Sequence, residues 1–265
     1  MNLRTLRLYV EALAMLVILQ SCSIKEDRSE CPCRVSVKTQ TNEECLVYFL
    51  DENTAILNKK TMLPDELCQG ENYTDIRKGS LTVSVLQSPS EVLIRGSHIV
   101  SCRSGAEADP LYAWTVHTEA IGEDLLVQSS LQKQYAEVTV HLVGNASEEF
   151  PNEVKIQSAL GGLDLYTLEA AKGEGFSIKP KVEDGACRFR ILRQKNSEPI
   201  MLYLEDSEDG SVTDSVDLNR YIALSGYNWD ADSLDDINVD IDYVKMTISI
   251  SIEGWSDWEV FTLFE

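Results

Sequence analysis

Alternating apolar and polar residues form the clearest pattern in this chain, and they predict β-strands. Segments 136–142 and 244–253 both place an apolar side chain at every second position. A period of two puts those side chains on one face, as in a strand with one buried side. We therefore predict strands over both segments. The apolar phase shifts by one position between Tyr243 and Val244, which predicts a bulge or a tight turn near Asp242.

Shorter apolar runs predict further strands, whereas helical patterns are few and short. These runs lie at 35–38, 45–50, 81–86, 92–95, 111–117, 154–157, 187–192 and 200–204. Clusters of glycine, proline, asparagine and aspartate separate them at intervals of about ten residues. Many short strands divided by turns favour β-sandwiches over alternating helices and parallel strands. The predicted fold class is therefore mainly β.

A polar run at 129–133 indicates where the chain divides. It separates the predicted strand at 111–117 from the stronger one at 136–142. We therefore predict an N-terminal β-sandwich domain at 34–130 and a C-terminal one at 131–265. The length of the chain is also compatible with one large all-β domain.

The first 21 residues have the order of a bacterial secretory signal peptide. Arg4 and Arg7 supply positive charge, and 12–19 is a short apolar core. A membrane-spanning helix needs about 20 apolar residues, so this core is too short to remain as a span. We predict that residues 1–21 are a signal peptide and are removed.

The residues around the predicted cleavage point indicate a lipid anchor. Ser21 directly before Cys22, with Leu19 three positions before that cysteine, resembles the lipobox of bacterial lipoproteins. We expect Cys22 to carry the lipid. One acyl chain gives only marginal membrane affinity, so stable anchoring relies on the several chains of a mature lipoprotein. An ordinary secretory signal followed by a chance cysteine is the alternative.

A short charged motif follows the predicted lipid site. Lys25, Glu26 and Asp27 resemble the signal that sends lipoproteins of the Bacteroidota to the outer surface of the outer membrane. A plain solvated tether is the alternative interpretation, because charged residues are common in linkers. We predict that 22–33 is a lipidated tether and that the protein is anchored by lipid in the outer membrane, exposed at the cell surface.

The charge of the chain excludes one class of partner. The sequence holds 44 acidic and 23 basic residues, which gives a net charge of −21. Such a surface repels nucleic acid and keeps the protein soluble. We therefore expect no nucleic-acid partner.

Motifs for catalysis are missing from the sequence. It has no G-x-S-x-G elbow, no H-E-x-x-H motif, no glycine-rich phosphate loop and no redox C-x-x-C. A pair of glycosidase carboxylates could be hidden among the many acidic residues. We nevertheless predict that the protein is not an enzyme and uses no cofactor.

Six cysteines remain after Cys22, and their even number favours disulfides in an exported protein. They are Cys31, Cys33, Cys45, Cys68, Cys102 and Cys187. Six cysteines allow 15 pairings, and the sequence does not choose among them. The C-P-C spacing at the first two is poorly placed to form a bridge within itself. A zinc site is the alternative, but no second close Cys/His pair completes four ligands.

Tryptophans and a run of aspartates are candidates for ligand binding at the surface. Exposed tryptophans could stack on sugar rings in a module that binds glycans or host proteins, although in a sandwich they are more often part of the core. They are Trp114, Trp229, Trp255 and Trp258. The carboxylates could bind calcium, but they lack the EF-hand spacing, so a solvated acidic loop is favoured and no metal site is predicted. They are Asp230, Asp232, Asp235, Asp236, Asp240 and Asp242.

Both ends of the chain resemble a known family. The stretch from Cys22 through the acidic tether to the C-P-C at Cys31 and Cys33, running into a strand at Arg34, resembles the mature start of FimB-like fimbrial anchoring subunits of the Bacteroidales. The alternating strand that runs into Gly254 and Trp255 is similar to that family's closing strand. The middle of the chain matches only as a pattern of strands.

The resemblance implies a fold, a partner and a role. It implies two tandem transthyretin-like β-sandwich domains behind a lipoprotein signal peptide. It also implies that the protein holds the base of a fimbria at the cell surface and binds a fimbrial structural subunit. Such subunits assemble by β-augmentation, in which main-chain hydrogen bonds supply affinity and side-chain pockets supply specificity.

Overall fold

The computed structural model describes residues 31–87, 93–94, 98–143, 153–206, 209–242, 245–254 and 259–263. The predicted signal peptide, Cys22, the motif from Lys25 to Asp27, and the tryptophans Trp255 and Trp258 all lie outside these residues. The described chain is mainly β, as predicted. None of its helices has the length and apolar character that crossing a membrane requires.

The described elements are strands, with two short helices among them. In order they are β1 (Cys33–Lys38), β2 (Cys45–Leu50), β3 (Ile56–Met62), α2 (Pro64–Gln69), β4 (Thr74–Ile76), β5 (Gly79–Gln87), β6 (Leu93–Ile94), β7 (Ile99–Ser101), β8 (Tyr112–Ala120), β9 (Asp124–Gln128), β10 (Gln132–Lys133), β11 (Tyr135–Val143), β12 (Glu153–Ser158), β13 (Gly162–Asp164), β14 (Ala170–Ala171), β15 (Phe176–Ile178), β16 (Val182–Glu183), β17 (Ala186–Leu192), β18 (Ile200–Glu205), β19 (Val212–Asp217), α3 (Leu218–Leu224), β20 (Ile237–Asp242), β21 (Thr247–Ile252) and β22 (Glu259–Thr262).

Every strand predicted from the apolar pattern is present, and most begin or end within two residues of the predicted bounds. The prediction for 244–253 was wrong at its start, because β21 begins only at Thr247. Met246 has φ +54 and lies in the turn instead. The predicted tight turn near Asp242 is confirmed, since Asp242 pairs with Thr247 across an antiparallel hairpin.

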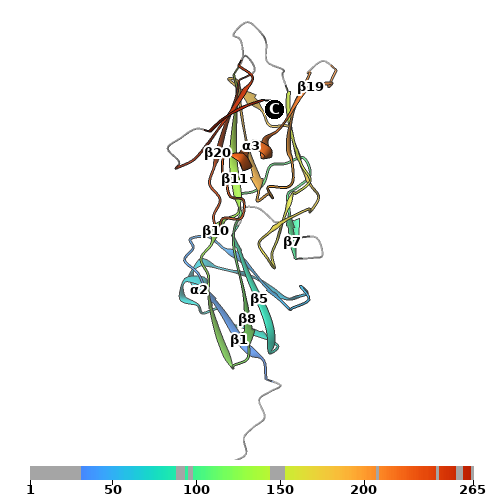
Figure 1. The fold of residues 1–265 in the computed structure, drawn as a ribbon. Coiled ribbons are helices and arrows are strands. Elements are labelled where there is room, and N and C mark those ends of the chain that lie inside the picture. The colour runs from blue at the N-terminus through green and yellow to red at the C-terminus, as the bar shows by residue number, and fades with distance from the viewer. Residues whose placement is uncertain are drawn as a thin grey trace, which may run out of the picture.

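The N-terminal half is a sandwich of two sheets, which we call the first sandwich. Its sheets have the strand orders β4-β1-β9 and β10-β8-β5-β2-β3. Apolar side chains from both sheets form one buried cluster between them, including Val35 of β1, Phe49 of β2 and Val83 of β5. These elements occupy the lower half of the molecule in Figure 1, where the blue start of β1 lies at the lower end.

The C-terminal half is the second sandwich, in the upper half of Figure 1. Its sheets have the orders β16-β17-β11-β20-β21-β22 and β15-β12-β18-β19. Val140 of β11 and Leu202 of β18 are fully buried between them. Asp217 begins α3 by accepting a hydrogen bond from the backbone N–H of Asn219, a normal N-cap.

A small fifth sheet, the junction sheet, links the two sandwiches. It has the order β14-β13-β7-β6, so strands from before and after β11 meet in it. Ser101 of β7 pairs with Gly162 of β13. A Cβ atom at Gly162 would lie 2.8 Å from the Val100 carbonyl oxygen, so only glycine allows this approach.

The first strand, β1, is held along its length. It pairs with β4 on one side and, in parallel, with β9 on the other. The buried Asn72 side chain accepts a hydrogen bond from the Val37 N–H (2.7 Å) and donates to the Val37 carbonyl (2.6 Å) and the Glu66 carbonyl (2.9 Å). Asn72 therefore ties α2 to β1.

We expect Asn72→Ala to lower the free energy of unfolding by about 3 kcal/mol, because the variant leaves the buried N–H and C=O of Val37 without this partner. Urea unfolding followed by circular dichroism measures the change. Asn58→Ala, on the exposed strand β3, is the matched control and should change stability by less than about 0.5 kcal/mol. Equal effects of the two variants would contradict this role for Asn72.

Candidate functional site

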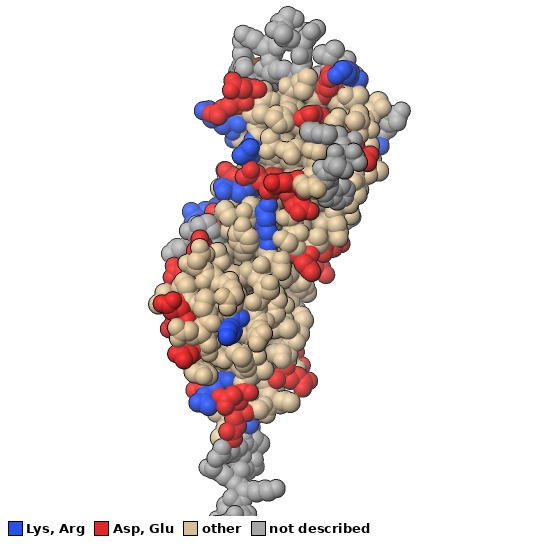
Figure 2. Space-filling view, turned by 90° about the vertical axis from the view of Figure 1, so that its left-hand side faces the viewer, with Lys and Arg blue, Asp and Glu red and all other residues tan. Residues whose placement is uncertain are grey.

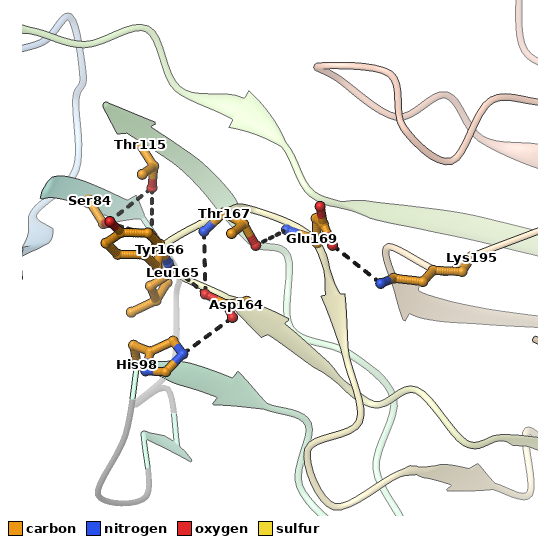
Figure 3. A network of polar contacts seen from close by, with 9 residues as sticks. All are labelled: Ser84, His98, Thr115, Asp164, Leu165, Tyr166, Thr167, Glu169 and Lys195. Carbon is orange, nitrogen blue, oxygen red and sulfur yellow. Dashed lines mark hydrogen bonds and ion pairs between the residues drawn. The ribbon is translucent and has the colours of Figure 1, made fainter. Parts of the chain in front are cut away.

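The turn between β13 and β14 joins the two sandwiches. Asp164 shapes it, because its Oδ1 accepts hydrogen bonds from the backbone N–H groups of Tyr166 (2.7 Å) and Thr167 (3.3 Å). The other carboxylate oxygen lies 3.3 Å from Nε2 of His98. Figure 3 shows these contacts, with Leu165 next to Tyr166 at the start of the turn. The turn thus presents the Leu165 carbonyl toward the first sandwich.

Two hydroxyl groups of the first sandwich lie within hydrogen-bond distance of the Leu165 carbonyl oxygen. Ser84 of β5 donates to Leu165 O at 2.6 Å, and Thr115 of β8 lies 2.9 Å from the same oxygen. The two hydroxyls are 3.0 Å apart. Ser84 is fully buried, so its hydroxyl and the carbonyl satisfy each other where water does not reach.

A histidine continues the same row of polar side chains. Nδ1 of His117 lies 2.8 Å from the Thr82 hydroxyl, and its ring packs against Tyr166 with centroids 4.5 Å apart. Tyr48 and Leu50 of β2 lie in the same buried cluster as residues of the second sandwich. The junction therefore combines apolar packing with specific hydrogen bonds, and it makes the two sandwiches one continuous body.

A surface groove runs along β17 at one edge of the second sandwich, and we call it the edge groove. Its cavity volume is about 750 Å³. Lys179 and Lys181 lie on one side of it and Ala106 on the other, while Cys187 and Phe189 of β17 contribute buried side chains. The groove is therefore built on β17, which lies next to the two-residue edge strand β16 of a six-stranded sheet.

The segment before β8 covers part of this edge. Ala108 donates its N–H to the Arg190 carbonyl (2.9 Å), and the Glu107 carboxylate accepts from the N–H of Arg190 (3.2 Å) and from its Nε (3.0 Å). β16 pairs with β17 only at Ala186 and Cys187. The edge groove lies between these two covers. Open stretches of an edge strand can pair with a strand of another chain.

The charges around the edge groove are balanced within the protein. Lys179 bridges Glu153 and Glu205 at 2.7 Å each, and both carboxylates raise the pKa of its ammonium group. Arg188 lies 3.3 Å from Glu137. Figure 2 shows basic and acidic side chains interspersed over the upper half of one face. The groove therefore carries no large excess of positive or negative charge. A partner would bind it mainly through main-chain and apolar contacts.

The six cysteines expected to form disulfides are free thiols in the structure. Burial raises the pKa of Cys45 to about 11 and the pKa values of Cys102 and Cys187 to about 12. Burial also raises the pKa of Cys33, whereas Cys31 is exposed. Four of the six therefore serve as small apolar side chains in the two buried clusters.

The other candidate residues take separate places. Trp229 belongs to the core, where its indole N–H donates to Asn219 Oδ1 at 2.7 Å. Asp236 of the acidic run pairs with Lys133 and accepts from the Glu137 N–H. Among the residues that the structure describes, no three His, Cys or acidic side chains are grouped to bind a metal ion. The calcium hypothesis therefore gains no site from this part of the chain.

The junction generates a double-mutant prediction. Ser84→Ala and Thr115→Val should each cost about 1 kcal/mol of stability, because one donor to Leu165 O remains. The double variant should cost more than the sum, by roughly 1 kcal/mol, since that buried carbonyl then lacks both donors. Thermal or urea unfolding of the four proteins completes the cycle. Strict additivity would show that the two hydroxyls do not share the carbonyl.

The cysteines generate a labelling prediction. At pH 8, below the raised pKa values of Cys45, Cys102 and Cys187, these thiols stay protonated, and the thiolate is the reactive form. In mature protein carrying Cys22→Ser, iodoacetamide should therefore modify Cys31 at least about a hundredfold faster than these three. Peptide mass spectrometry gives the rates.

The same protein, unfolded without reductant, tests the free thiols directly. Six alkylated cysteines per chain would agree with the structure. Four or fewer would reveal a disulfide and contradict it.

Comparison with known proteins relates this fold to a family. A family model described as fimbrillin-A associated anchor proteins Mfa1 and Mfa2 matches residues 103–261. No curated protein sequence matches the chain. Several solved structures do, and their strands follow the same course.

Three of these structures illustrate the likeness. A candidate polysaccharide-binding protein from Bacteroides thetaiotaomicron has 13% identity and a TM-score of 0.60, over 88% of this chain and 99% of that one. A candidate adhesin from Bacteroides ovatus has 16% identity and a TM-score of 0.58, over 89% and 97%. The fimbrial anchor protein Mfa2 from Porphyromonas gingivalis has 16% identity and a TM-score of 0.58, over 85% and 98%.

Identities this low establish the fold alone. The family model adds sequence evidence over more than half of the chain, from the segment before β8 into β22. The chain therefore belongs to the family of fimbrillin-A associated anchor proteins.

Proposed function

We propose that this protein is a lipoprotein of the outer membrane that anchors a fimbria by binding its basal subunit. Membership of an anchor-protein family supports an association with fimbriae at the cell surface. The lipid on Cys22 would supply the membrane attachment, and Lys25, Glu26 and Asp27 would direct the protein to the outer face. No catalytic role is proposed.

The arrangement of the chain supports this role. β1, which would follow the tether, begins at the lower end of the molecule in Figure 1. The edge groove is lined by β17 of the second sandwich, which occupies the upper half. Membrane attachment and subunit binding would then occupy different parts of the protein. We also propose that 34–130 and 131–265 are its two domains, with 22–33 as the tether.

The edge groove is the place where we propose that the subunit binds. An extended segment could align with β17 between its two covers and form main-chain hydrogen bonds, while apolar side chains contact the groove. The observation that carries this proposal is the incomplete cover of β17, with Glu107 and Ala108 on one side and β16 on the other.

The lipid anchor is tested by replacing Cys22 with alanine in the producing cell. We expect fimbrial subunits and this protein to move together from the cell fraction to the medium, because the covalent attachment is lost. Pull-down from both fractions with mass spectrometry measures the shift. Subunits that stay on the cell while the variant is released would contradict the anchor role.

The binding site is tested separately by filling the edge groove. Ala106→Trp should reduce co-purification of the basal subunit at least about tenfold, since the indole occupies the space of the partner segment. Ala55→Trp, on the exposed turn between β2 and β3, is the matched control. Unchanged co-purification with a folded Ala106→Trp protein would place the subunit elsewhere.

A further inference from the structure

A second groove lies where the two sandwiches meet, and we call it the waist groove. Its cavity volume is about 460 Å³. It brings together two features that are far apart in the sequence, namely Trp114 of β8 and the start of the aspartate run at Asp230 and Asp232. Gln132 of β10 and Glu169 next to β14 also line it. Four separate segments thus converge on one concave surface.

A buried network fixes the wall that carries the aspartates. Arg193, which is 6% exposed, donates to the carbonyls of Trp229, Ala231 and Asp232 and to the side-chain oxygen of Gln134. The Gln134 amide, 1% exposed, donates in turn to the carbonyls of Gln132 and Asp232. The hydrogen bonds of the guanidinium therefore all go to neutral oxygens. Burial lowers the pKa of Arg193, and the nearby charges of Asp230 and Asp232 partly offset this.

This arrangement leaves polar groups available to a ligand. The carboxylates of Asp230 and Asp232 are exposed, and neither has a hydrogen-bond or ion-pair partner among the described residues. Trp114 is half-buried, with part of its side chain against the core of the first sandwich. Gln132 has one long contact, 3.4 Å to the Ser130 hydroxyl. An indole, an amide and two carboxylates therefore line the same groove, and the carboxylates have no hydrogen-bond partner among the described residues.

These groups match the chemistry of one ligand class. A pyranose ring has an apolar face that packs on an indole, and its hydroxyls donate to carboxylates and exchange hydrogen bonds with amides. The volume lies in the range of about 300–1,000 Å³ found for small-ligand sites. The exposed carboxylates of Asp230 and Asp232 disfavour an anionic ligand, because like charges repel, whereas Glu169 is paired with Lys195.

We propose that the waist groove binds a neutral glycan, with Trp114 as the stacking surface and Asp230, Asp232 and Gln132 as hydrogen-bonding groups. Arg193 and Gln134 are positioning residues that hold the loop of the aspartates over the groove. This site is distinct from the edge groove, and it does not depend on the anchor role. A surface protein with both sites would hold a protein partner and a polysaccharide at once.

The test uses the full mature protein with Cys22→Ser and a panel of neutral oligosaccharides built from glucose, mannose, galactose or N-acetylglucosamine. Titration calorimetry and saturation-transfer NMR measure binding. We expect at least one oligosaccharide to bind, and Asp230→Asn, Asp232→Asn and Trp114→Phe each to weaken it about tenfold or more. Asp235→Asn, an exposed aspartate of the same run outside the groove, is the matched control and should bind normally.

Two kinds of result would overturn the proposal. One is the absence of binding at millimolar concentration of every sugar by a folded protein, checked by its unfolding curve. The other is equal weakening by Asp235→Asn, which would indicate a general effect of charge. A lysine-containing peptide that binds in a Trp114-dependent way while no sugar does would reassign the groove to a cation. These variants should co-purify the fimbrial subunit as well as the unchanged protein does. A failure of the glycan proposal can therefore be distinguished from a failure of the proposed anchor function.

Discussion

The hydrogen bonds that Ser84 and Thr115 make to the Leu165 carbonyl are the interaction on which the rest of this structure depends. They lie on the second face of the β10-β8-β5-β2-β3 sheet, whose first face already covers the core of the first sandwich. Buried hydroxyls without partners would oppose packing of that second face. The turn between β13 and β14 supplies the missing acceptor. The sheet is thereby covered on both sides, and the two sandwiches form one body.

This double coverage explains how both grooves keep their shape. The waist groove spans the sandwiches, so its walls stay in register only if the junction is rigid. The edge groove takes one side from 105–107, which precedes β8, and the other from 179–183 and β17. Cys102 N–H donating to the Gly161 carbonyl ties the first of these segments to the turn before β13. Motion at the junction would therefore change the shape of the waist groove, whereas the edge groove is also held by the direct bond from Ala108 to Arg190 of β17.

The sequence predicted most of the longer strands that bury one or both faces. It missed short ones such as β4 and β15, because three residues are too few to establish a period. β11 alternates because one face is solvated, and β2 is a continuous apolar run because both its faces are covered. β3 and β22 were not predicted, since almost all their side chains are exposed and the apolar period is lost. The hairpin of β16 and β17 carried a usable signal at Asp184 and Gly185, both at positive φ, as a two-residue turn requires. The grooves depend on loops packed against distant strands, which a periodic pattern does not encode.

The acidic run illustrates why sites of this kind need tertiary information. In the sequence its six aspartates are equivalent, and repulsion suggests a solvated loop. In the fold Asp236 is neutralised by Lys133 and Asp242 by Lys245, so those two carboxylates serve structure. Asp230 and Asp232 instead lie on a loop whose backbone carbonyls are taken by Arg193. Because hydrogen bonds to backbone carbonyls hold the loop, the carboxylates of Asp230 and Asp232 can line the same groove as Trp114. Only the fold distinguishes them from the two aspartates that serve structure.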